Sequence, residues 1–78
     1  MRRKEQKVVI TFRNTTSAMA MEKLCKEKGL SGRLIPVPRC ITAGCGLAWS
    51  VDLHKRLELE NFMNETHISY DQIYELEI

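Results

Sequence analysis

Two prolines stand close together in the second apolar segment of this 78-residue sequence, at Pro36 and Pro38. Proline has no backbone N–H to donate inside a β-sheet, so a strand that contains one belongs at a sheet edge. Residues 33–37 are otherwise short and apolar, and they predict such an edge strand. Any fold for this chain must therefore leave that strand at the margin of the sheet.

A strand and a helix are predicted before that segment. Residues 7–12 alternate β-branched and aromatic side chains, which is typical of a central strand. Residues 14–17 supply four candidate N-caps for a helix that ends at Gly29. We expect Cys25 to be a core residue, because it lies with Met21 on the apolar stripe of this helix.

Three further elements are predicted after a loop at residues 39–44. Residues 47–51 alternate around Trp49, which we expect to be buried, and they predict a strand paired with the one before it. A second helix should follow and end near residue 66, with Asp52 as its candidate N-cap. Its expected apolar positions are Leu53, Leu57, Phe62 and Met63. Residues 74–78 alternate again and predict the last strand.

The order strand, helix, strand, strand, helix, strand indicates an α+β fold of the ferredoxin-like βαββαβ type. In that fold a four-stranded antiparallel sheet has the strand order 4132 and carries both helices on one face. The order places the strand with Pro36 at an edge, as proline requires. We expect residues 1–6 to form a disordered tail and residues 7–78 to form a single ferredoxin-like domain.

Composition argues against several classes of function. Twelve Lys and Arg against ten Asp and Glu give a net charge of +2, which weakens the case for a nucleic-acid partner. We expect a cytoplasmic protein without a membrane segment, since no apolar run is long enough for one. No carboxylate pair, catalytic triad or phosphate-binding loop is evident, so we expect neither a self-contained enzyme nor a cofactor.

The most informative residue for function is Cys45, which stands between Gly44 and Gly46. Glycines beside a thiol let backbone N–H groups approach closely and stabilise a thiolate. The fold places this loop at the end of the sheet where the first helix begins, so we expect Cys45 near the helix N-terminus at residues 14–17. Arg39 is a candidate for stabilising the anion. The alternative is a tight turn that contains an inert cysteine.

Other side chains have weaker claims on the same loop. Arg13 could add positive charge, and His67 could approach Cys45 from the end of the second helix. Cys40 lies five residues before Cys45 and could act as a resolving thiol in a disulfide. Four zinc ligands cannot be assembled from these cysteines and the two histidines, so we expect no metal site.

A family resemblance adds to this interpretation. The succession Thr11-Phe12, then Ala18 with Glu22 and Lys23, then Ile35-Pro36-Val37-Pro38-Arg39, then Cys45-Gly46-Leu47, resembles the selenium/sulfur carrier protein-like family, also known as a domain of unknown function. The resemblance extends from about residue 7 to residue 74. Its most specific element is the Pro-x-Pro-Arg stretch followed by Cys-Gly.

The resemblance implies that Cys45 carries sulfur or selenium as a persulfide or selenium adduct. The donor would be a cysteine desulfurase or a selenocysteine lyase, and the acceptor selenophosphate synthetase or another acceptor protein. Cys40 is an addition to the family pattern, which leaves its role open. Two alternatives remain: a regulatory or protein-binding module of ferredoxin-like shape, and a thiol redox sensor that uses Cys40 and Cys45.

Overall fold

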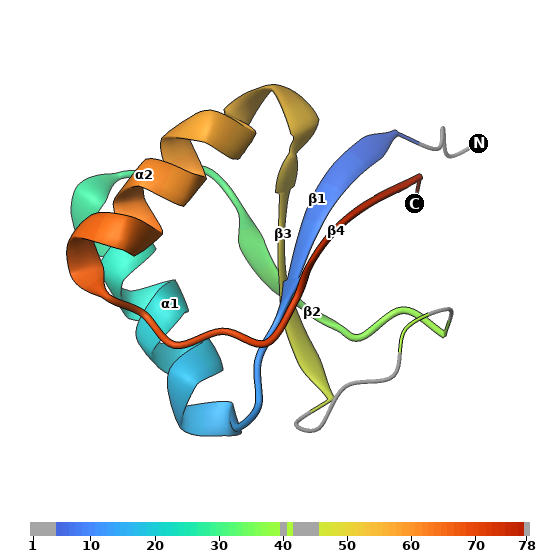
Figure 1. Ribbon diagram of the computed structural model, residues 1–78, viewed down its shortest axis with the longest axis horizontal. Helices are drawn as coiled ribbons and strands as arrows, with labels where there is room; N and C mark the ends of the chain where they lie inside the picture. Colours follow the sequence, from blue (N-terminus) through green and yellow to red (C-terminus); the bar gives the residue numbers. More distant parts are fainter. Residues whose placement is uncertain (1–4, 40, 42–45, 78) are drawn as a thin grey trace.

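The computed structural model describes residues 5–39, 41 and 46–77. The elements follow the predicted order of strand, helix, two strands, helix and strand (Figure 1). They are β1 (Gln6–Thr11), α1 (Thr15–Lys28), β2 (Arg33–Pro36), β3 (Leu47–Asp52), a short 3-10 turn (Leu53–Lys55), α2 (Arg56–Thr66) and β4 (Ile73–Glu77). This α+β arrangement is consistent with the predicted ferredoxin-like fold.

The four strands form one antiparallel sheet in the order β2-β3-β1-β4. This is the predicted order 4132, counted from the other edge. The strand that contains Pro36 lies at the edge, and Pro36 is paired with Leu47 in the register of β2 and β3. β2 ends at Pro36, one residue before the predicted end.

Helix α1 begins and ends on the residues that the sequence predicts. Asn14 is the N-cap, and its Oδ1 accepts a hydrogen bond from the N–H of Ser17 at 2.9 Å. Gly29 is the C-cap in the left-handed conformation, with φ of 70°. The helix buries Ala18, Met21 and Cys25, so the prediction that Cys25 is a core residue is confirmed.

The start of the second helix differs from the prediction. The side chain of Asp52 makes no capping hydrogen bond and instead accepts one from Nζ of Lys7, its cross-strand partner on β1. A 3-10 turn, Leu53–Lys55, then precedes α2 and changes the helical phase. Leu59, Phe62 and Met63 are buried on one side of α2, and Leu57 is exposed because helical spacing places it on the other side.

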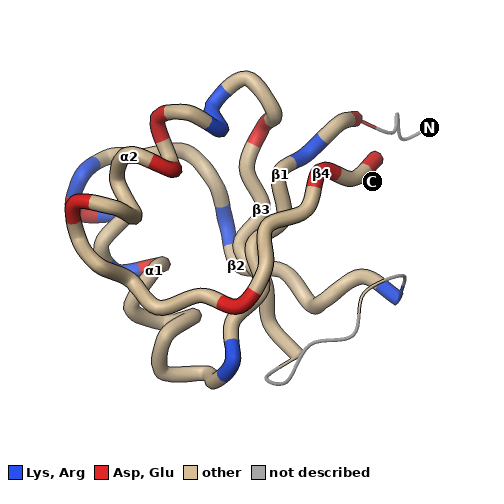
Figure 2. The backbone as a smooth tube through the Cα atoms, in the orientation of Figure 1, with Lys and Arg blue, Asp and Glu red and all other residues tan. Residues whose placement is uncertain are grey.

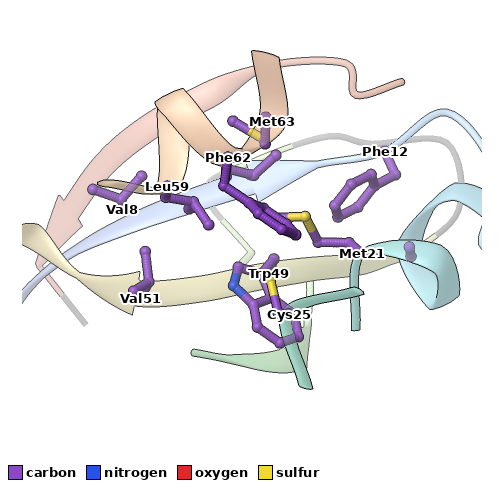
Figure 3. Packing of buried hydrophobic residues seen from close by; sticks show 11 residues of the cluster. Val8, Phe12, Met21, Cys25, Trp49, Val51, Leu59, Phe62 and Met63 are labelled. Carbon is purple, nitrogen blue, oxygen red and sulfur yellow. The ribbon is translucent and has the colours of Figure 1, made fainter. Parts of the chain in front are cut away.

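Both helices pack on the same face of the sheet, which we call the helix face (Figure 1). Trp49 is only 2% exposed there, which confirms the prediction that it is buried, and Phe12 of the segment after β1 is fully buried. Figure 3 shows side chains from the strands and from both helices in one cluster. The buried members are Val8, Ile10, Phe12, Ala18, Met21, Cys25, Trp49, Val51, Leu59, Phe62 and Met63.

Charged residues of both signs are interspersed over the helices and the strand ends of the described chain (Figure 2). Arg56 links α2 to β4, because its guanidinium donates to Glu60 at 3.0 Å and also to Glu75. These carboxylates raise the pKa of Arg56. Within the described residues, no helix has both the length and the apolar character that crossing a membrane requires.

Candidate functional site

The candidate site is the loop that connects β2 to β3. The structure describes residues 37–39, 41 and 46 of this loop. The predicted site residues Cys40, Gly44 and Cys45 lie outside the described residues. The geometry of the site is therefore given by the residues on either side of them.

Two backbone hydrogen bonds organise the described part of the loop. The N–H of Val37 donates to the carbonyl oxygen of Gly46 at 3.0 Å. This bond joins the two ends of the loop, since Val37 directly follows β2 and Gly46 directly precedes β3. The N–H of Ile41 donates to the carbonyl oxygen of Pro38 at 3.0 Å and closes a turn. The loop thus leaves the sheet and returns to it at adjacent points.

Gly46, the residue that follows Cys45 in the sequence, has a φ of 77°. A Cβ at this position would meet no atom within 4 Å, so the need for glycine is conformational rather than steric. A residue with a side chain would favour a negative φ at this position, and the backbone would then enter β3 in a different direction. That Gly46 shapes the loop around Cys45 stays a prediction.

Ile41 is the described loop residue with the most buried side chain, at 8% exposure. It packs with Val9 of β1 and Ala48 of β3 on the face of the sheet opposite the helices, which we call the open face. In Figure 1 the green segment after β2 turns to that side, away from both helices. Ile35, Val37, Tyr74 and Leu76 are half-buried around this contact.

Sequence reasoning did not single out Ile41. The signal that could have found it is a large aliphatic side chain in a loop otherwise made of small and polar residues, because such a side chain is usually buried somewhere. Sequence alone gave no means of choosing the face, since the order of strands fixes the end of the sheet at which a loop lies but not the side to which it turns.

The side chains predicted to approach Cys45 lie in different surroundings. Arg13 forms an ion pair with Asp71 of the segment before β4, with Nε and Oδ1 3.6 Å apart. Arg39 is exposed. His67 is the exposed C-cap of α2, in the left-handed conformation with φ of 57°. Cys45 lies outside the described residues, so the structure gives no distance from it to these groups or to the N-terminus of α1.

Cys25 is a cysteine of a different kind. Its side chain is fully buried on the helix face, and burial raises the pKa of its thiol from the ordinary 9.0 to about 11. At neutral pH this sulfur is almost entirely protonated and shielded from reagents. Cys25 thus has the properties of a packing residue.

A cluster of charged side chains lies where β1 begins and β3 ends, at the end of the sheet away from the loop. Nζ of Lys7 lies 3.1 Å from a carboxylate oxygen of Glu5 and also donates to Asp52. The hydrogen bond from Lys7 lowers the pKa of Asp52, and the two carboxylates raise the pKa of Lys7. Among residues 5–39, 41 and 46–77, no three His, Cys, Asp or Glu side chains gather closely enough to hold a metal ion.

Comparison with known protein families matches this chain to a family model. The sequence model of the family described as "Putative Se/S carrier protein-like" matches residues 7–75, nearly the whole chain. No curated protein and no solved structure matches the chain significantly. The matched range includes both strands that flank the loop, together with the loop itself.

Proposed function

Because this chain belongs to the Se/S carrier protein-like family, we propose that it carries sulfur or selenium on the thiolate of Cys45. The family match over residues 7–75 is the observation that carries the proposal. The donor is a cysteine desulfurase or a selenocysteine lyase, and the acceptor is selenophosphate synthetase or another acceptor protein. The chain is a carrier and not a self-contained enzyme.

The transfer step needs no cofactor. The Cys45 thiolate attacks the terminal sulfur of a persulfide on the donor enzyme and forms a new S–S bond. The donor's own S–S bond breaks, and the donor cysteine leaves as a thiolate with the electron pair. One persulfide and one thiolate are consumed and one of each is formed, so there is no net oxidation. Delivery to the acceptor repeats the step in the opposite sense.

The properties of the cysteines support Cys45 as the carrier. A carrier thiol must be ionised and accessible to two proteins. Cys25 is neither, since it is buried and its pKa is about 11. This leaves Cys40 and Cys45, and only Cys45 has a glycine on each side.

The neighbouring residues have proposed roles in the same step. Gly44 and Gly46 give the backbone the freedom to turn its N–H groups toward the sulfur. The positive φ of Gly46 is consistent with that role. The exposed Arg39 is available to pair with the thiolate or with the terminal sulfur of the persulfide.

The test is loading by a cysteine desulfurase supplied with L-cysteine and followed by mass spectrometry of the intact protein and its peptides. We expect the wild type to gain the mass of one sulfur atom on the peptide that contains Cys45. Cys45→Ser should abolish the adduct. Cys40→Ser and Cys25→Ser are the matched controls and should retain it.

Two results would contradict the proposal. One is an unloaded wild type with both a desulfurase and a selenocysteine lyase as donors. The other is an unchanged adduct on Cys45→Ser, which would assign the cargo to Cys40 or Cys25. A second incubation of the loaded protein with selenophosphate synthetase tests delivery, with loss of the adduct from Cys45 as the expected result.

A further inference from the structure

The anchoring of Ile41 on the open face is a feature that the carrier function by itself does not explain. Ile41 belongs to the loop, yet it is 8% exposed, close to the values of core residues. Its contacts, Val9 and Ala48, are themselves fully buried. The side chain of Ile41 thus attaches a described point of the loop to the sheet.

The surface under Ile41 belongs to the two central strands. β1 is hydrogen-bonded to β3 and β4, and β3 is hydrogen-bonded to β1 and β2, so neither has a free edge. Local opening of a strand paired on both sides costs more than opening of an edge or a loop. Ile41 packs on these two strands with Val9 of β1 and Ala48 of β3.

We propose that Ile41 is a positioning residue that holds the loop in the arrangement in which Cys45 meets its donor, an inference that rests on the proposed carrier function. The loop is fixed at its base by the bond between Val37 and Gly46, and near its middle by Ile41. Only residues 42–45 separate Ile41 from Gly46. In the sequence, Cys45 thus stands between two described points of attachment, Ile41 and Gly46.

Such anchoring matters for docking on a protein and much less for reaction with a small reagent. A protein donor has to meet the loop in one arrangement, and ordering a loose loop at each encounter lowers the rate of transfer. A small alkylating agent reaches a thiol in many arrangements. Loss of the anchor should therefore slow loading by the enzyme and leave alkylation nearly unchanged.

The experiment compares Ile41→Ala with the conservative Ile41→Val, both in a Cys40→Ser background that leaves one loop thiol. Leu57→Ala is the matched control, because it removes an exposed aliphatic side chain from α2. Three rates are measured: loading by the desulfurase, alkylation by iodoacetamide, and hydrogen exchange of the amides of Val37 and residue 41. Thermal unfolding establishes that each variant is folded.

For Ile41→Ala we expect loading to slow by about tenfold, since small losses of orientation have effects of this size or larger. Exchange of the two loop amides should accelerate by a similar factor, alkylation should change less than about twofold, and Ile41→Val should restore loading. Faster exchange with unchanged loading, or equal slowing of loading and alkylation, would overturn the inference. A wild type that alkylates normally but cannot be loaded would instead refute the carrier function, and this inference with it.

Discussion

The helix face and the open face of the same sheet are covered by different parts of the chain. On the helix face, the aromatic side chains of Phe12 and Trp49 are buried against residues from both helices. On the open face, Val9 and Ala48 are equally buried, and among the described residues the buried side chain over them is Ile41 of the loop. The apolar side chains packed around this contact are only half-buried: Ile35, Val37, Tyr74 and Leu76.

Because of this difference, the residues that contribute most to the stability of the fold and the residues of the candidate site lie on different faces of the sheet. Free energy gained from burial scales with apolar area, and the large side chains lie on the helix face. The open face has smaller buried side chains and is covered in part by the loop that carries the proposed cargo cysteine. Changes on the helix face should therefore destabilise the fold, whereas changes on the open face should mainly affect the loop.

The largest expected effect is that of Phe12→Ala on the helix face. Removal of a fully buried aromatic ring leaves a cavity and should lower the free energy of unfolding by about 3–5 kcal/mol. Ile35→Ala, which truncates a half-buried residue on the open face, should cost about 1–2 kcal/mol. Urea unfolding measures both, with the single Trp49 as a fluorescent reporter. An equal loss of unfolding free energy in the two variants would show that the helix face does not contribute more to stability than the open face.

A smaller effect is expected from a methyl group added at the margin of the helix face. A Cβ at Gly32 would clash with the indole ring of Trp49, and the φ of 122° at Gly32 disfavours any side chain. Gly32→Ala should therefore cost about 3 kcal/mol and shift the fluorescence of Trp49. Gly29→Ala is the matched control, because a Cβ there meets no atom within 4 Å.

The control isolates the steric part of the effect. Gly29 has a positive φ of 70°, so its substitution should cost about 1–2 kcal/mol for backbone conformation alone. A Gly32→Ala variant no less stable than Gly29→Ala would show that the indole of Trp49 moves aside without loss. The packing of the helix face would then be looser than the structure indicates.

The sequence was sufficient to predict those features that depend on local chemistry. Pro36 cannot donate a hydrogen bond, and this alone placed β2 at the edge. Asn14 and Gly29 end their helix through contacts within a few residues, so the bounds of α1 were predictable. The strand order then followed from the order of the elements.

Features that depend on distant contacts were not predictable. The local sequence predicts Asp52 as a helix cap, but its side chain accepts a hydrogen bond from Lys7 on the neighbouring strand instead. The pairing of Arg13 with Asp71 and the burial of Ile41 likewise join segments far apart in the chain. The proposed roles of Cys45, Cys40 and Gly44 stay predictions.

The smallest effect concerns Cys25, the cysteine of the helix face, and it tests the contrast with the loop cysteines. Cys25→Ala should lower the free energy of unfolding by about 1 kcal/mol at neutral pH, from lost packing. Because burial raises the pKa of this thiol to about 11, the neutral form is favoured in the folded state. Its contribution is complete below pH 9.0, the ordinary pKa, and is lost as the pH rises toward 11.

The stability advantage of wild type over Cys25→Ala should therefore fall between pH 9 and pH 11 by up to about 1.4 kcal/mol per pH unit, so that it vanishes at about pH 10 and reverses in sign above it. Urea unfolding of both proteins across this range measures it. Lys7 also titrates at high pH, but it is present in both proteins, so its effect cancels in the difference. A difference that stays constant with pH would mean that the thiol of Cys25 ionises as readily in the folded chain as in the unfolded one. Cys25 would then return as a candidate for the cargo, and the division between an inert helix face and a reactive loop would fail.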